Sequence, residues 1–302
     1  MATETEYVDA GTAVDFHTLA AVVGSAPPAA KGVTYERILK AREEPDNWLT
    51  YYGAYDGQRF SPLDQINAGN VRNLKPAWVF QCGSMGMHSG ASTYSFEASP
   101  LIVDGVMYVT GWDGWVWALD AAKGTELWRY KHASPYDVSL CCGNVNRGCA
   151  VAEGKVFVTT LNAHVLALDC EDGRVIWDQV YGDVRAGESA TVAPLIVKDM
   201  VIVGSSGGEF GVRGHADAFK LETGERVWRC YMVPAPGEPG SETWPSDGEA
   251  WARGGANCWT TPTYDPELNL LYFNTGNPCP DFDGGVREGD NLYTDCVVAV
   301  DP

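Results

Sequence analysis

The chain has few basic residues and no long apolar run. No stretch approaches the roughly 18 consecutive apolar residues that predict a transmembrane helix. Lys and Arg together number 21 against 40 Asp and Glu, which gives a formal net charge of −19. Because phosphate backbones and anionic lipids repel such a surface, the charge argues against nucleic acid and membrane partners. It favours a basic protein partner instead.

A zinc-type cysteine pattern is also absent. The sequence has nine Cys but no Cys-x2-Cys pair, and the odd count leaves at least one thiol unpaired if disulfides form. Cys141 and Cys142 are adjacent, and their Cα atoms are held about 3.8 Å apart, whereas a relaxed disulfide prefers roughly 4.4–6.8 Å. A bond between them would be a strained eight-membered ring. The alternative is two reduced thiols packed as small hydrophobes.

The first residues lack the usual features of an export signal. The segment 1–34 carries Glu4 and Glu6 near its start and has no basic stretch followed by an apolar one. We expect residues 1–34 to form a loose segment and a first helix to run from Tyr35 to Arg42. The sequence thus shows no signal peptide.

A repeated module dominates what is present. The module Ala-x-Asp-x3-Gly-x3-Trp begins at Ala118 and Ala167, 49 residues apart, and again 51 residues later at Ala218, where Lys220 replaces Asp. A fourth copy opens at Ala299, 81 residues after the third. A period near 50 residues indicates an array of similar supersecondary units.

Short apolar strands precede each module, and turn residues join them. Asp104-Gly105 is a strong two-residue hairpin signal, and Glu153-Gly154 and Lys198-Asp199 take the same place in the next two units. Each unit therefore predicts about four antiparallel strands, the blade of an all-β propeller. The period exceeds that of a WD40 array, and a β-sandwich does not repeat Gly and Trp at fixed offsets. We expect the Trp to pack between blades and the Asp and Gly to form a tight turn.

Two dispersed patterns occur in the chain besides the repeat. The first comprises Asn47-Trp48, Tyr52-Gly53, Phe60-Ser61-Pro62-Leu63, Ile66-Asn67, Asn70-Val71, Leu74 and Ala77-Trp78. The second runs from Trp259 through Tyr264-Asp265 and Asn269-Leu270-Leu271-Tyr272-Phe273 to Thr275-Gly276-Asn277-Pro278. Both patterns resemble those of the pyrroloquinoline quinone (PQQ) dependent alcohol dehydrogenases, the quinoprotein methanol and ethanol dehydrogenase family. The likeness covers residues from about 35 to 302.

The resemblance implies an eight-bladed quinoprotein β-propeller. Residues 35–302 would supply its N-terminal blades, about half of an incomplete ring, and would act within a longer protein. The family oxidises small primary alcohols or related substrates and passes electrons to a cytochrome c. It is generally periplasmic, and a homodimer is compatible with it.

The resemblance also implies a set of PQQ-binding residues. Trp259 matches the floor beneath the flat cofactor, and the disulfide between Cys141 and Cys142 would close the other face. Arg147 matches an arginine near the cofactor, where a guanidinium would pair with a carboxylate or quinone oxygen. The remaining matches are a glutamate that contacts the cofactor and two hydroxyls that bind its carboxylates, at Glu97, Thr191 and Ser206.

A metal site is implied beside the cofactor. Glu209, within a glycine-rich segment, matches the metal-binding glutamate, and Asn277 matches an asparagine whose side-chain oxygen binds the same ion. These oxygen ligands suit Ca²⁺ or a lanthanide. The family's general-base aspartate is expected beyond Pro302, so neither Asp290 nor Asp295 is assigned that role. We therefore expect the chain alone to be inactive.

The candidate residues also have ordinary structural interpretations. Taken singly, Arg147 is an ordinary surface residue, Asn277 an ordinary turn residue, and Thr191 and Ser206 ordinary strand residues. A non-catalytic propeller that acts as a scaffold or binding protein is the alternative function, and an inactive fragment is another. The combination of the Cys pair, Arg147, Glu209, Trp259 and Asn277 separates these hypotheses, because a scaffold does not require it.

Overall fold

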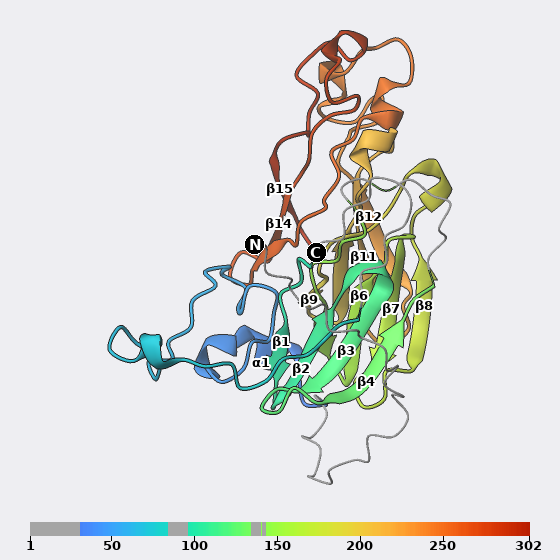
Figure 1. Cartoon of the computed structure of the whole chain (residues 1–302). Coiled ribbons are helices and arrows are strands. Elements are labelled where there is room, and N and C mark those ends of the chain that lie inside the picture. Colours follow the sequence, from blue (N-terminus) through green and yellow to red (C-terminus); the bar gives the residue numbers. More distant parts are fainter. Residues whose placement is uncertain (1–30, 84–95, 134–139, 141–142) are drawn as a thin grey trace, which may run out of the picture.

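The structure, a computed structural model, describes residues 31–83, 96–133, 140 and 143–302. These residues form four antiparallel sheets and short connecting helical turns (Figure 1). The all-β prediction is confirmed. Within the same residues, no helix has the length and apolar character needed to cross a membrane.

The first three sheets each contain four strands in chain order. The first comprises β1 (Leu101–Val103), β2 (Val106–Thr110), β3 (Trp115–Asp120) and β4 (Glu126–Lys131). The second comprises β5 (Ala150–Ala152), β6 (Lys155–Thr159), β7 (His164–Asp169) and β8 (Val175–Val180). The third comprises β9 (Leu195–Val197), β10 (Met200–Gly204), β11 (His215–Lys220) and β12 (Arg226–Tyr231). The predicted repeat of four-stranded blades is therefore correct.

The fourth sheet has three strands among the described residues. They are β13 (Thr263–Asp265), β14 (Leu270–Asn274) and β15 (Val297–Val300). The loops before β13 and between β14 and β15 extend away from the sheets at the top of Figure 1. Because β15 carries the start of the fourth Ala-x-Asp module, its position corresponds to that of β3, β7 and β11.

Two-residue turns join the first two strands of each of the first three sheets. Asp104 and Gly105 both have positive φ, 51° and 84°, and so do Glu153 and Gly154, at 49° and 72°. This is the conformation that a type I′ turn requires at its two central residues. The turn places Val103 opposite Val106, as the hairpin signal predicted.

The repeated Trp and Gly join neighbouring blades. The indole of Trp128 in the first blade donates its Nε1 hydrogen to the Cys170 carbonyl in the second at 3.0 Å, and Trp177 donates to the Leu221 carbonyl at 3.1 Å. Each ring covers the glycine of the next turn so closely that a Cβ on Gly173 would lie 2.6 Å from Trp128. The prediction that the Trp packs between blades and the Gly forms a turn is confirmed.

Burial falls from the first strand of a blade to the last. All residues of β9 and β10 are buried, whereas those of β12 are exposed or partly buried. The first strands β5 and β9 contact each other directly, so the apolar centre lies where successive blades meet. Continuous apolar runs in the inner strands follow from burial on both faces.

The predicted helix at Tyr35 to Arg42 is only partly correct. Helix α1 covers Tyr35–Leu39, and a separate 3₁₀ turn covers Ala41–Glu43. Thr34 caps the start, since its side chain accepts a hydrogen bond from the Arg37 backbone N–H. The helix ends early because the Lys40 N–H bonds to the Arg37 carbonyl at 3.1 Å, three residues back, which tightens the last turn.

Candidate functional site

The predicted site residues share a position in the blade. Four of them lie three or four residues before the first strand of successive sheets: Glu97 before Leu101, Arg147 before Ala150, Thr191 before Leu195 and Trp259 before Thr263. Ser206 and Asn277 follow the ends of the second strands β10 and β14. Because first and second strands are antiparallel, all six positions fall at the same end of the sheets.

Backbone hydrogen bonds connect these segments between blades. The Ser99 N–H donates to the Arg147 carbonyl at 2.9 Å, and the Arg147 N–H donates to the Thr191 carbonyl at 3.1 Å. Ser189 and Ser206 then exchange two bonds, at 3.1 and 2.8 Å. Residues from three blades are thus held in one continuous ladder.

Arg147 lies at the centre of one half of the site. Its guanidinium contacts the Glu97 carboxylate at 3.1 Å and donates to Thr191 Oγ1 at 2.7 Å. The same group lies over the Trp259 ring, with 4.8 Å between Cζ and the ring centroid. These contacts leave the guanidinium plane fixed beside an aromatic face, which suits recognition of a flat anion.

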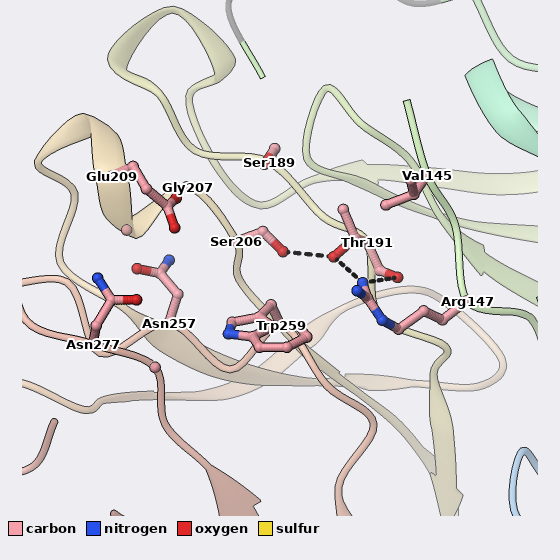
Figure 2. Close-up of a pocket in the computed structure, with 12 residues that line it drawn as sticks. Val145, Arg147, Ser189, Thr191, Ser206, Gly207, Glu209, Asn257, Trp259 and Asn277 are labelled. Atoms are coloured by element: carbon pink, nitrogen blue, oxygen red, sulfur yellow. Dashed lines mark hydrogen bonds between the residues drawn. The ribbon is translucent and has the colours of Figure 1, made fainter. Parts of the chain in front are cut away.

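Thr191 and Ser206 form a hydroxyl pair next to Arg147. Their oxygens are 3.0 Å apart, and both residues are largely buried (Figure 2). Since each hydroxyl can donate as well as accept, the pair can turn hydrogens toward a carboxylate that enters the cavity.

Glu209 occupies a short 3₁₀ turn, Gly208–Phe210, between two glycines of positive φ. Gly207 has φ 106°, and a Cβ there would lie 2.0 Å from the Gly187 carbonyl oxygen. No other residue fits at Gly207 without moving the backbone. The glycine-rich segment therefore brings Glu209 to the cavity by allowing two backbone segments to pass closely.

A second ladder aligns the other half of the site. Gly255 donates its N–H to the Val212 carbonyl at 3.0 Å, and Ala256 donates to the Asn277 carbonyl at 3.0 Å. The Gly276 N–H returns to the Asn257 carbonyl at 3.0 Å. The segments that follow Glu209, precede Trp259 and contain Asn277 are therefore neighbours.

These parts line one cavity of about 230 Å³ (Figure 2). The structure brings six predicted residues together around it: Arg147, Thr191, Ser206, Glu209, Trp259 and Asn277. The sequence interpretation missed the other lining residues, which are Val145, Ser189, Gly207, Gly208, Asn257 and Gly276. Asn257 could have been noticed, because it precedes Trp259 by two residues and alternation in an extended segment puts both side chains on one side.

The other predicted residues are placed differently. Glu97 is not among the cavity-lining residues but pairs with Arg147, which is. Cys141 and Cys142 lie outside the described residues, so their role as a closing disulfide stays a prediction. The cysteines that the structure does describe are all free thiols.

The donor set fits a hard cation held together with a cofactor. In the described part of the chain, no three His, Cys, Asp or Glu side chains are grouped to hold a metal by themselves. Glu209 and Asn277 instead offer one carboxylate and one amide, which an oxygen-rich ligand would have to complete. The buried Asn257 Oδ1, which also lines the cavity, has no hydrogen-bond donor among the described residues. An orphaned oxygen there suits a cation site.

A buried cluster of charged residues lies next to the segments that carry the site. His215 is fully buried, with Nδ1 2.5 Å from Asp217 Oδ2 and Nε2 3.3 Å from Glu188 Oε1. Burial by itself lowers the pKa of His215, but the hydrogen bonds to Asp217 and Glu188 outweigh it and raise the pKa above the ordinary 6.5. The cluster is connected to the cavity through Ser189, the neighbour of Glu188, which lines it. It is also connected through Ser205 Oγ, which accepts the His215 backbone N–H at 2.9 Å and a hydrogen bond from the cavity-lining Asn257.

Comparison with known proteins supports the sequence resemblance. Residues 48–302 match the PQQ family model, which describes the beta-propeller domain of glucose/ethanol/alcohol dehydrogenases. The quinoprotein alcohol dehydrogenase PedH of Pseudomonas putida is 39% identical over 89% of this chain and 47% of its own length. Methanol dehydrogenase [cytochrome c] subunit 1 of Methylorubrum extorquens is 38% identical over 91% of this chain and 47% of its own.

A solved structure agrees with these relatives. A europium-containing methanol dehydrogenase superposes with a TM-score of 0.79 at 37% identity, covering 88% of this chain and 49% of that one. The chain spans about half the length of the curated relatives it matches. The chain shares its fold with these dehydrogenases, is similar to them in sequence and matches the family over residues 48–302. It therefore belongs to the family of PQQ-dependent alcohol dehydrogenases, and the matched residues correspond to the β-propeller domain.

Proposed function

We propose that the cavity binds PQQ and a metal ion, and that the protein containing this chain oxidises a small primary alcohol or a related substrate. The observation that carries the proposal is the convergence, in one cavity, of six residues that the sequence resemblance had assigned separately. The segments around three sheets contribute to that convergence, so local sequence similarity alone does not account for it.

The residues have distinct tasks in this proposal. The exposed face of Trp259 supports the flat ring system, and Arg147 supplies positive charge to a cofactor carboxylate or quinone oxygen. Thr191 and Ser206 donate hydrogen bonds to carboxylates, and Glu97 holds the guanidinium in place. Cys141 and Cys142 remain the proposed cover of the opposite face.

Glu209 and Asn277 are the proposed metal ligands. Their oxygens suit Ca²⁺, and the europium-containing relative favours a lanthanide as the second candidate. When bound, PQQ would supply the oxidant for the alcohol, and the metal held by Glu209 and Asn277 would supply Lewis acidity. The role of this chain is to orient the ring and to place one oxygen of Glu209 and one of Asn277 beside it.

We propose a partner and a location by analogy with the relatives. The relative from Methylorubrum extorquens is named for cytochrome c. The net charge of −19 is suited to a basic electron-accepting protein, so we propose a cytochrome c as acceptor. We also propose a periplasmic location, residues 35–302 as the first blades of the propeller, and a homodimer as the assembly to test.

Binding can be tested without measuring turnover. PQQ is titrated into the purified protein with Ca²⁺ or La³⁺ present, and its bound absorption spectrum and Trp fluorescence quenching are recorded. Glu209→Ala should abolish uptake at concentrations that saturate the wild type. The matched control is Glu267→Ala, an exposed glutamate in the β13–β14 turn at the far end of that sheet, which should bind as wild type does. Equal uptake by wild type and Glu209→Ala would contradict the assignment.

A further inference from the structure

Asn257 has an amide whose orientation is fixed. The residue is 2% exposed, and its Nδ2 donates to Ser205 Oγ at 2.9 Å. Ser205 Oγ also accepts the backbone N–H of His215 at 2.9 Å, which holds the hydroxyl in place. Because the nitrogen is held on the Ser205 side, the amide oxygen faces the other way.

That oxygen is buried without a partner. Among the described residues no donor reaches Asn257 Oδ1. A buried acceptor without a hydrogen bond typically lowers the stability of the folded protein by about 1–3 kcal/mol. A bound group that contacts the oxygen would remove this penalty. The space beside it is kept open by Gly208, where a Cβ would lie 3.1 Å from Oδ1. Asn257 is also one of the residues that line the 230 Å³ cavity.

Its neighbours in the cavity are also oxygen donors. Figure 2 shows the amide oxygens of Asn257 and Asn277 facing one another, with the Glu209 carboxylate on the neighbouring side of the Asn257 amide. The Asn277 amide is oriented by Asp281, whose carboxylate accepts from Asn277 Nδ2 at 2.6 Å. Glu209 makes no ion pair with any described residue. Three such groups repel one another unless a cation or a donor lies between them.

We propose that Asn257 Oδ1 is a third protein oxygen ligand of the metal, beside Glu209 and Asn277. The inference rests on the proposed function, because it concerns the same ion. Hard cations take six to eight oxygens, so a carboxylate and two amides leave room for cofactor oxygens in the shell. The two neutral amides leave Glu209 as the one charged ligand of the three, which makes the site sensitive to any charge added at position 257.

The test measures metal affinity directly. Purified protein is equilibrated with PQQ and dialysed against Ca²⁺ or La³⁺, and bound metal is quantified by elemental analysis. Asn257→Ala removes the oxygen and should weaken both ions about tenfold. Asn257→Asp replaces the amide oxygen with a charged one and should tighten both, La³⁺ by the larger factor because its charge is higher. Asn73→Asp, an exposed change of equal charge, should leave both affinities unchanged.

The outcomes separate this inference from the proposed function. If wild-type protein binds neither metal with PQQ present, the proposed function fails. If wild type binds but Asn257→Ala and Asn257→Asp match it, Asn257 is not a ligand and the inference is overturned. Melting curves of the metal-free variants show whether a weaker affinity comes from unfolding. A folded Asn257→Asp that binds more weakly than wild type would also overturn the inference.

Discussion

The contact between Trp128 and Gly173 can be separated from the backbone strain of the same turn. Gly173 has φ 73°, and a Cβ there would lie 2.6 Å from Trp128 Cε3. Gly154, in the same sheet, has φ 72° and nothing within 4 Å of its Cβ position. Alanine at either position suffers the same left-handed strain, about 1–2 kcal/mol. Only Gly173→Ala also collides with the indole.

The additional loss can be estimated from the contacts. Carbon atoms pack best at about 3.5–4.0 Å, so the indole must move by roughly 1 Å. Overpacking of this kind costs about 1–3 kcal/mol. The shift also threatens the hydrogen bond from Trp128 Nε1 to the Cys170 carbonyl, 3.0 Å long and worth about 0.5–1.5 kcal/mol. We expect Gly173→Ala to lose about 3–5 kcal/mol and Gly154→Ala about 1–2 kcal/mol.

Urea unfolding followed by Trp fluorescence measures both variants. The free energies of unfolding of the two variants, obtained from their urea midpoints with a common slope m, should differ by about 2–3 kcal/mol. Equal midpoints would refute the claim that the ring docked on Gly173 holds the first two blades together. A red-shifted native emission in Gly173→Ala alone would locate the change at Trp128.

Three further predictions concern the site and its support. Arg147→Lys keeps the positive charge but loses the planar guanidinium, so PQQ affinity should fall about tenfold when it is measured by fluorescence quenching. An unchanged affinity would contradict the proposal that Arg147 binds PQQ. Asp281→Ala frees the Asn277 amide to rotate, so metal affinity should fall severalfold in equilibrium dialysis while the apo protein melts normally. His215→Gln removes a buried cation between carboxylates and should cost about 3 kcal/mol at low pH. Because the folded pKa of His215 is raised, its contribution is complete below pH 6.5 and is lost as the pH rises through the folded value. The difference from wild type in urea unfolding should therefore shrink at high pH, and a constant or growing difference would contradict this.

Much of the fold was predictable because its signals are local. Asp104-Gly105 specifies a turn by backbone conformation alone, and the Gly and Trp of each module recur at a spacing that the chain itself reveals. The end of the first helix was not predictable in this way. The helix ends where the Lys40 N–H donates to the carbonyl three residues back instead of four. The 3₁₀ and α-helical geometries that these two hydrogen bonds define are nearly equal at a helix end.

The site was predictable only where a family pattern identified the residue. Arg147 and Trp259 are far apart in the chain, and nothing local says that they lie in cation–π contact. Asn257 was missed because its importance lies in an absent donor, which only the three-dimensional arrangement reveals. Asp281 was missed for a related reason, since its effect on Asn277 depends on one side-chain contact across a loop.

Whether the cavity holds PQQ and a metal together can be seen in a crystal structure of the protein with both added. We expect the ring system to lie on Trp259, a carboxylate to lie near Arg147 and Thr191, and one metal ion to be bound to Glu209 and Asn277. The anomalous signal of La³⁺ would identify the ion independently of its ligands. A ring bound elsewhere, or an ion that does not touch Glu209, would contradict the account.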